Sequence, residues 1–143
     1  MLVSEILAIK GKVLFTIAPN KSVAEAIEIM NEQDVGSLVV FSRGEMVGML
    51  TFRQVLQGVQ KGSADLHALT VEAVMIRNPF AASPNMEMDE LRRMMVEHHQ
   101  RYLLVLPEPY QSLCQPPLLI LLEQWVIYMN TILQRLLMHL QKL

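Results

Sequence analysis

The sequence has a single cysteine and a single tryptophan, and it has no glycine after Gly62. Because Cys114 has no second cysteine to pair with, an internal disulfide is excluded, and a reducing compartment, the cytoplasm, is favoured. The N-terminal residues MLVSEILAIKGK lack the basic region, apolar stretch and small-residue cleavage site of a secretory signal. We therefore expect a cytoplasmic protein.

An excess of charge of one sign is also lacking. The net charge is -2, the pI is about 6.1, and the twelve Lys and Arg residues form no basic run, so nucleic acid is not an expected partner. The longest apolar region, residues 118–140, contains Glu123, Gln124, Asn130, Gln134 and Arg135. These polar residues argue against a membrane span.

Catalytic and metal-binding patterns are absent as well. The chain has no Ser-His-Asp order, no glycine-rich phosphate loop and no CxxC pair. His98 and His99 are adjacent, so on a helix they would not share a face, and no second ligand pair follows at i+4. The sequence predicts neither an enzyme nor a metal site, and the two histidines are interpreted as a solvated helix end.

What the sequence does have is a core and a repeat. Hydrophobic residues make up 52% of the 143 residues, which is enough for a buried core. Residues 15–40 align without gaps on residues 80–105 at an offset of 65, with eight of 26 positions identical, among them Phe15/Phe80, Pro19/Pro84 and Met30/Met95. This correspondence indicates a duplicated structural unit.

Each copy begins with a short extended piece before a Pro-Asn turn. In the first copy, Ser22 and Glu25 fit a capping box that starts a helix ending near residues 33–34. The apolar run SLVVF then predicts a buried strand, SRGEM a turn around Gly44, VGML a second strand, and residues 52–59 a further helix. The expected order is β-α-β-β-α.

A tandem unit of this order, with FTIAP opening, DVGSLVV in the middle and VGMLTFR closing, resembles the cystathionine β-synthase (CBS) domain, and in particular the small bacterial proteins that consist of one pair of such domains. The resemblance covers residues 3–105. It implies an α/β (α+β) fold in which two motifs form a pseudo-twofold pair, the second incomplete. It also implies clefts that hold AMP, ATP, NAD or S-adenosylmethionine, a homodimer, an unknown regulated protein, and no catalysis or required cofactor.

Thr51 and Arg53 lie where the second strand of the first copy gives way to a helix. The Thr51 hydroxyl would lie beside amides at the positive end of the helix dipole, and Arg53 would add a cation, which together suit a phosphate. However, Thr51 and Gln54 also fit a capping box, which needs no ligand. Both interpretations stay open from the residues alone.

The resemblance extends this site to other residues and assigns a second one. It implies a first ligand site made of Thr16, Val35, Gly36, Ser37, Leu38, Thr51, Arg53 and Gln54. The family usually has an acid that takes the ribose diol where this chain has Gln54, and an amide would bind the diol without a charge. A second cleft would be lined by His99, Arg101, Tyr102 and Leu103.

The repeat stops at Val105, which sets the expected division of the chain: residues 1–62 for the first motif with its lead-in, 63–72 for a linker, 73–105 for the first half of the second motif, and 106–143 for a divergent tail. At the offset of 65, the closing Gly48 and Thr51 would fall on Leu113 and Pro116. Residues 106–143 are either out-of-frame translation or a genuine tail, helical over 118–140.

Two functions follow from the sequence. The first is a regulatory sensor that binds an adenine nucleotide and changes the activity of a partner. The alternative is a structural dimerisation module whose ligand site has degenerated, which Gln54 and the broken second copy favour.

Overall fold

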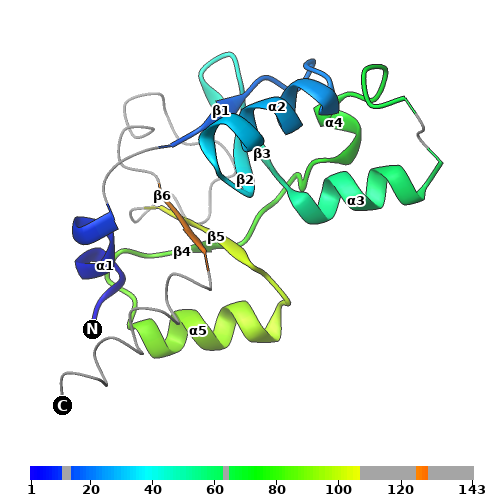
Figure 1. The fold of residues 1–143 in the computed structure, drawn as a ribbon. Helices are drawn as coiled ribbons and strands as arrows, with labels where there is room; N and C mark the ends of the chain where they lie inside the picture. The colour runs from blue at the N-terminus through cyan, green and yellow to red at the C-terminus, as the bar shows by residue number, and fades with distance from the viewer. Residues whose placement is uncertain (11–13, 63–64, 107–124, 129–143) are drawn as a thin grey trace. The chain divides into compact units, whose positions relative to one another are not determined.

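The structure is a computed structural model, and it describes residues 1–10, 14–62, 65–106 and 125–128. The described residues fall into two compact units (Figure 1). The first-copy unit contains the described residues of Leu14–Pro79. The second-copy unit combines those of Met1–Val13 and Phe80–Gln111 with the strand at 125–128.

The first-copy unit contains a three-stranded sheet with strand order β1-β2-β3, in which β1 and β2 are parallel and β2 and β3 antiparallel. Its elements are β1 (Thr16–Ile17), α2 (Val23–Gln33), β2 (Ser37–Ser42), β3 (Glu45–Thr51), α3 (Phe52–Gln60) and the short α4 (Val71–Val74). Its core joins both sheet and helices: Ile17, Val23, Ala26, Met30, Leu38, Val40, Leu50, Val55, Val71 and Met75.

The predicted elements of the first copy are confirmed. Ser22 and Glu25 form the capping box of α2, and the helix ends at Asp34, whose left-handed backbone (φ 52°) lets its N–H bond the Met30 carbonyl. Between β2 and β3, Arg43 and Gly44 have φ values of 53° and 79°. Two successive positive φ angles are typical of the tight turn that joins twisted antiparallel strands.

The second-copy unit repeats this arrangement 65 residues later. It contains β4 (Ala81–Ala82), α5 (Met88–Glu97), β5 (Tyr102–Val105) and β6 (Trp125–Tyr128), with strand order β4-β5-β6. The pair Thr16 and Val39 recurs as Ala81 and Leu104. His99, the counterpart of Asp34, has the same φ of 52°. The duplication found in the sequence is therefore also present in the structure.

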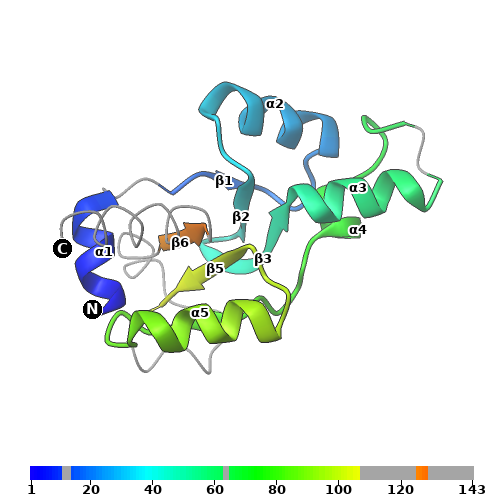
Figure 2. The ribbon, with the colours of Figure 1, turned by 60° about the horizontal axis from the view of Figure 1, so that its bottom comes forward.

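Each copy also has a short helix that precedes the other copy in sequence. Helix α1 (Val3–Lys10) packs into the core of the second-copy unit through Val3, Ile6 and Leu7, beside α5 and β5 (Figure 2). The N–H of Val3 bonds the Met86 carbonyl, and the N–H of Val71 in α4 bonds the carbonyl of Lys21, which is the counterpart of Met86 at the offset of 65. The two leaders therefore dock in the same way, each on the copy that it does not directly introduce.

The sequence-based division placed residues 1–62 together and residues 63–72 in a linker. The packing shows in addition which core each leader joins. Residues 71–76 belong to the first-copy unit, and α1 belongs to the second-copy unit. The reason is that the repeat detected in the sequence begins at Phe15, whereas the leaders contribute apolar side chains to cores formed elsewhere in the chain.

The helix expected over 118–140 is wrong for the part that the structure describes. Residues 125–128 form β6, which pairs antiparallel with β5 from Val105–Trp125 to Tyr102–Tyr128. The run WVIY consists of aromatic and β-branched residues, which favour a strand. It forms the third strand of the sheet, on the side of β5 away from β4. The rest of 107–143 lies outside the described residues. Among the helices that the structure does describe, none has the length and apolar character needed to span a bilayer.

Candidate functional site

The candidate site is the junction at which β3 passes into α3. Thr51 is both the last residue of β3 and the N-cap of α3, and it pairs with Ser37, the first residue of β2. The N–H of Phe52 donates to the Gly36 carbonyl at 3.2 Å. The structure thus brings Gly36, Ser37 and Thr51 together at one end of the sheet.

Thr51 and Gln54 form the predicted capping box. Gln54 Oε1 accepts hydrogen bonds from the Thr51 N–H at 3.2 Å and from the Thr51 hydroxyl. Thr51 is 7% exposed, so these contacts hold its side chain in place. Because Oε1 is already engaged, the Gln54 NH₂ group is what remains for a ligand, and it can only donate.

The first turn of α3 has no acidic residue. Arg53 is exposed on this turn, so its fixed positive charge adds to the positive end of the nine-residue helix. The electrostatics of the junction therefore favour an anion.

Three predicted residues share one face of the first sheet. Thr16 is opposite Val39, and Val39 lies two residues from Ser37, so strand alternation places Thr16, Ser37 and Thr51 on the same face. Thr16 lies in one row with the buried Val39 and Met49, and Ser37 and Thr51 form the next row on this face.

Val35 and Leu38 contribute differently. Val35 is partly buried and packs against the first-copy core, and its N–H bonds the Met30 carbonyl at 3.0 Å. The Leu38 side chain is fully buried in the same core, on the face opposite Ser37. Only backbone atoms of Leu38 can therefore take part in a site at this junction.

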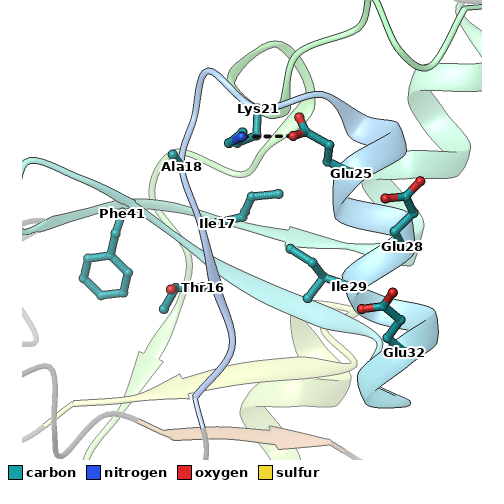
Figure 3. A pocket seen from close by; sticks show the side chains of 9 residues that line it. All are labelled: Thr16, Ile17, Ala18, Lys21, Glu25, Glu28, Ile29, Glu32 and Phe41. Atoms are coloured by element: carbon teal, nitrogen blue, oxygen red, sulfur yellow. Dashed lines mark hydrogen bonds and ion pairs between the residues drawn. The ribbon is translucent and has the colours of Figure 1, made fainter.

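A cavity of about 540 Å³ lies between α2 and β1 (Figure 3). It is lined by Thr16, Ile17, Ala18, Lys21, Glu25, Glu28, Ile29, Glu32 and Phe41. Of the predicted ligand residues it contains only Thr16. Lys21, Glu25, Glu28 and Glu32 were not predicted, although three glutamates at i, i+3 and i+7 already indicate one acidic helix face.

The charges of this cavity are partly paired. Lys21 Nζ lies 3.0 Å from Glu25 Oε1, and Figure 3 shows this pair at one end of the glutamate row. The hydrogen bond from the Ser22 backbone, and then that from Lys21, lower the pKa of Glu25 below its ordinary value. The cavity is thus predominantly acidic, which does not suit a phosphate.

The predicted second cleft has a different character. His99 and Arg101 are exposed, Tyr102 is partly buried, and Leu103 is fully buried in the second-copy core. His98 stacks on Phe80 with ring centroids 4.0 Å apart. Both histidines are exposed at the end of α5, as the sequence analysis expected.

The pairing of β5 with β6 corrects the expected counterparts of Gly48 and Thr51. Val40 pairs with Gly48 and Ser37 with Thr51, and the corresponding partners in the second copy are Trp125 and Tyr128. Leu113 and Pro116 had been expected from the offset of 65, which fails because residues after 105 add length before the third strand. The second copy therefore has an aromatic residue where the first has Thr51.

Comparison with known proteins decides the family. The family model of the CBS domain matches residues 3–61 and 71–111. The chain belongs to the CBS-domain family. The matched ranges include both leaders, α1 and α4, so the CBS model encompasses the docking helices that the internal repeat missed.

Individual CBS proteins are similar over much of the chain. The CBS domain-containing protein YhcV of Bacillus subtilis is 30% identical over 88 residues, which is 62% of this chain and 62% of that protein. The crystal structure of a CBS-domain protein from Agrobacterium tumefaciens is 21% identical with a TM-score of 0.80, covering 94% of this chain and 98% of that one.

A further structural neighbour contains ligands. The CBS domain pair of protein MJ0100, in complex with 5′-methylthioadenosine and S-adenosyl-L-methionine, has a TM-score of 0.72 and 20% identity, covering 95% of this chain and 99% of that one. At this identity the likeness establishes the fold.

Proposed function

We propose that this CBS-domain pair is a regulatory module that binds an adenine nucleotide at the Thr51 junction of its first copy and changes the activity of a partner protein. The observation that carries this proposal is the pairing of Ser37 with Thr51, which joins a strand end to the start of α3. Adenosyl compounds in a CBS pair of the same fold support the ligand class. Proteins made only of CBS domains are generally regulatory rather than catalytic.

The residues of the junction suggest distinct roles. The first turn of α3 and Arg53 would take the phosphate, because both supply positive charge. The Gly36 and Ser37 backbone would border the base, and the Gln54 NH₂ group would donate to the ribose. S-adenosylmethionine has no phosphate, so a preference for AMP, ATP or NAD would indicate that Arg53 determines the ligand.

Calorimetric titration of the full chain with AMP, ATP, NAD and S-adenosylmethionine tests the proposal. Arg53→Ala should weaken binding of a phosphate-containing ligand about ten- to a hundredfold, since a charge-assisted hydrogen bond contributes about 1.5–3 kcal/mol. The matched control is Lys61→Ala, which removes the cation at the other end of α3. Heat from none of the four ligands would contradict the proposal.

A second candidate is a structural dimerisation module, and one observation favours it. Phe52, Leu56 and Val59 are 45%, 69% and 47% exposed and follow one face of α3. An apolar helix face of this kind suits a helix of a second subunit. The homodimer implied by the family resemblance would then use α3.

Sedimentation of the full chain separates the two candidates when combined with the titration. Leu56→Glu should shift a dimer toward the monomer, whereas Gln57→Glu, off the apolar stripe of the same helix, should not. Dimerisation without binding of any of the four ligands would favour the structural module. A monomeric wild-type protein would exclude the structural dimerisation module.

A further inference from the structure

One segment contacts both elements that meet at Thr51. This clamp segment, residues 69–76, contains α4 and leads along the chain to Phe80 and β4. All of its contacts described below lie within the first-copy unit.

On the strand side, the clamp segment pairs with β3. The N–H of Met49 donates to the Ile76 carbonyl at 2.9 Å, and the N–H of Ile76 donates to the Met49 carbonyl at 2.8 Å. Neighbouring Gly48 makes this approach possible, because a Cβ there would lie 2.5 Å from the Ile76 oxygen and 2.9 Å from the Met75 sulfur. The two hydrogen bonds are two residues from Thr51.

On the helix side, the same segment packs against α3, and Figures 1 and 2 show α4 beside α3. A Cβ at Gly58 would lie 3.0 Å from Val74 Cγ1 and 3.1 Å from Leu69 Cδ2. The clamp segment therefore fits closely against both β3 and α3, at the two glycines that flank the junction.

We infer that the clamp segment is the element whose position responds to occupancy of the Thr51 junction; this inference rests on the proposed function. An anion bound at the start of α3 fixes the position of the helix relative to the end of β3. Because close-packed contacts transmit displacements instead of absorbing them, a change in that position moves residues 69–76. Residues 77–80 then connect the clamp segment to β4 along the chain.

Thermodynamic linkage makes the coupling reciprocal. A bound nucleotide that tightens the pairing of Met49 with Ile76 must bind more weakly, by the same factor, to a protein whose clamp has been displaced. The mild displacement is Gly58→Ala, because its methyl group would press on side-chain atoms of Leu69 and Val74, while alanine favours the α3 helix. Gln57→Ala, on the exposed side of α3, is the matched control.

The experiment measures amide hydrogen exchange at Met49 and Ile76 in the full chain, with and without whichever of the four titrated ligands binds most tightly. Saturating ligand should slow exchange at both amides about fivefold or more, the lower end of typical couplings. Gly58→Ala should raise the Kd about fivefold and speed exchange of Ile76 without ligand. Gln57→Ala should change neither quantity by more than about twofold.

Gly48→Ala should displace the clamp segment further, because its methyl group meets a backbone oxygen. We therefore expect a larger rise in the Kd than for Gly58→Ala. If the Gly48→Ala protein does not fold, the Gly58→Ala variant alone tests the inference. Binding with unchanged exchange at both amides would overturn the clamp and leave the proposed function standing. Binding of none of the four ligands would overturn the proposed function and the clamp with it. A wild-type Kd in Gly58→Ala would also overturn the clamp.

Discussion

The Ser22 hydroxyl oxygen accepts a hydrogen bond from the Glu25 N–H at 3.1 Å, and the Glu25 carboxylate accepts one from the Ser22 N–H at 2.9 Å. This reciprocal pair satisfies two N–H groups in the first turn of α2 that have no partner within the helix. Helix α2 in turn contributes Val23, Ala26 and Met30 to the first-copy core.

Replacing the cap residue should therefore destabilise the first copy. Ser22→Ala removes the acceptor for the Glu25 N–H, and we expect the free energy of unfolding to fall by about 1 kcal/mol. Chemical denaturation followed by circular dichroism measures this change. Asn31→Ala, an exposed change near the other end of α2, is the control; an equal loss in both variants would contradict the role of the cap.

The Glu25 carboxylate makes the same turn sensitive to pH. Its pKa is lowered from 4.5, first by the hydrogen bond from the Ser22 backbone and then by Lys21. A depressed folded-state pKa stabilises the protein fully above pH 4.5, and this stabilisation is lost as the pH falls through the lower, folded-state value. The difference in unfolding free energy between the wild type and Glu25→Gln should be largest near neutral pH and shrink in acid. A difference that does not change between pH 7 and pH 3 would contradict this assignment.

The docking of α1 predicts a long-range effect on the second copy. Leu7 is 5% exposed and lies in the core with Leu91 and Leu103, so Leu7→Ala should cost about 2–5 kcal/mol. Amide exchange should accelerate in α5 and β5, and not in α2. The matched variant is Met75→Ala, at the residue that caps the other leader α4, which should accelerate exchange in the first-copy unit instead. The opposite pattern would show that the leaders are assigned to the wrong cores.

The neutral side chain at position 54 should limit ribose binding. Gln54→Asp supplies a carboxylate, and a hydrogen bond from a ribose hydroxyl to a charged acceptor is roughly twice as strong as a neutral one. We expect calorimetry to show tighter binding of a ribose-containing ligand. The helix itself should tolerate the change, because an acidic residue in the first turn suits the helix dipole. Gln57→Asp is the control for added charge; equal effects would attribute the gain to charge alone.

Much of the first copy could be predicted from the sequence because its signals are local. Ser22 and Glu25 lie three residues apart, Gly44 marks its own turn, and Thr51 with Gln54 defines the start of α3. The assignment of Thr51, Gln54 and the other residues to a ligand site stays a prediction. The acidic cavity was missed because no local pattern indicates that Phe41 and Ile17 lie across from the α2 glutamates.

The second copy was harder to predict because its decisive contacts are not local. Val3 and Met86 are joined by a backbone hydrogen bond across most of the described chain, and the N-terminal sequence alone does not show where α1 packs. Likewise, Trp125–Tyr128 reads as part of a long apolar run, and only its pairing with Tyr102–Val105 makes it a strand. Tertiary pairing overrides such a local pattern.

The leaders also bear on the order in which the protein becomes folded during synthesis. The described residues of the first-copy unit lie between Leu14 and Pro79, whereas the second-copy unit needs α1 together with residues from Phe80 onward. Since translation proceeds from the N-terminus, helix α1 leaves the ribosome before the first-copy unit but is buried only after that unit has been made. Until β5 has been made, the apolar side chains of Val3, Ile6 and Leu7 lack the core that covers them in the finished protein.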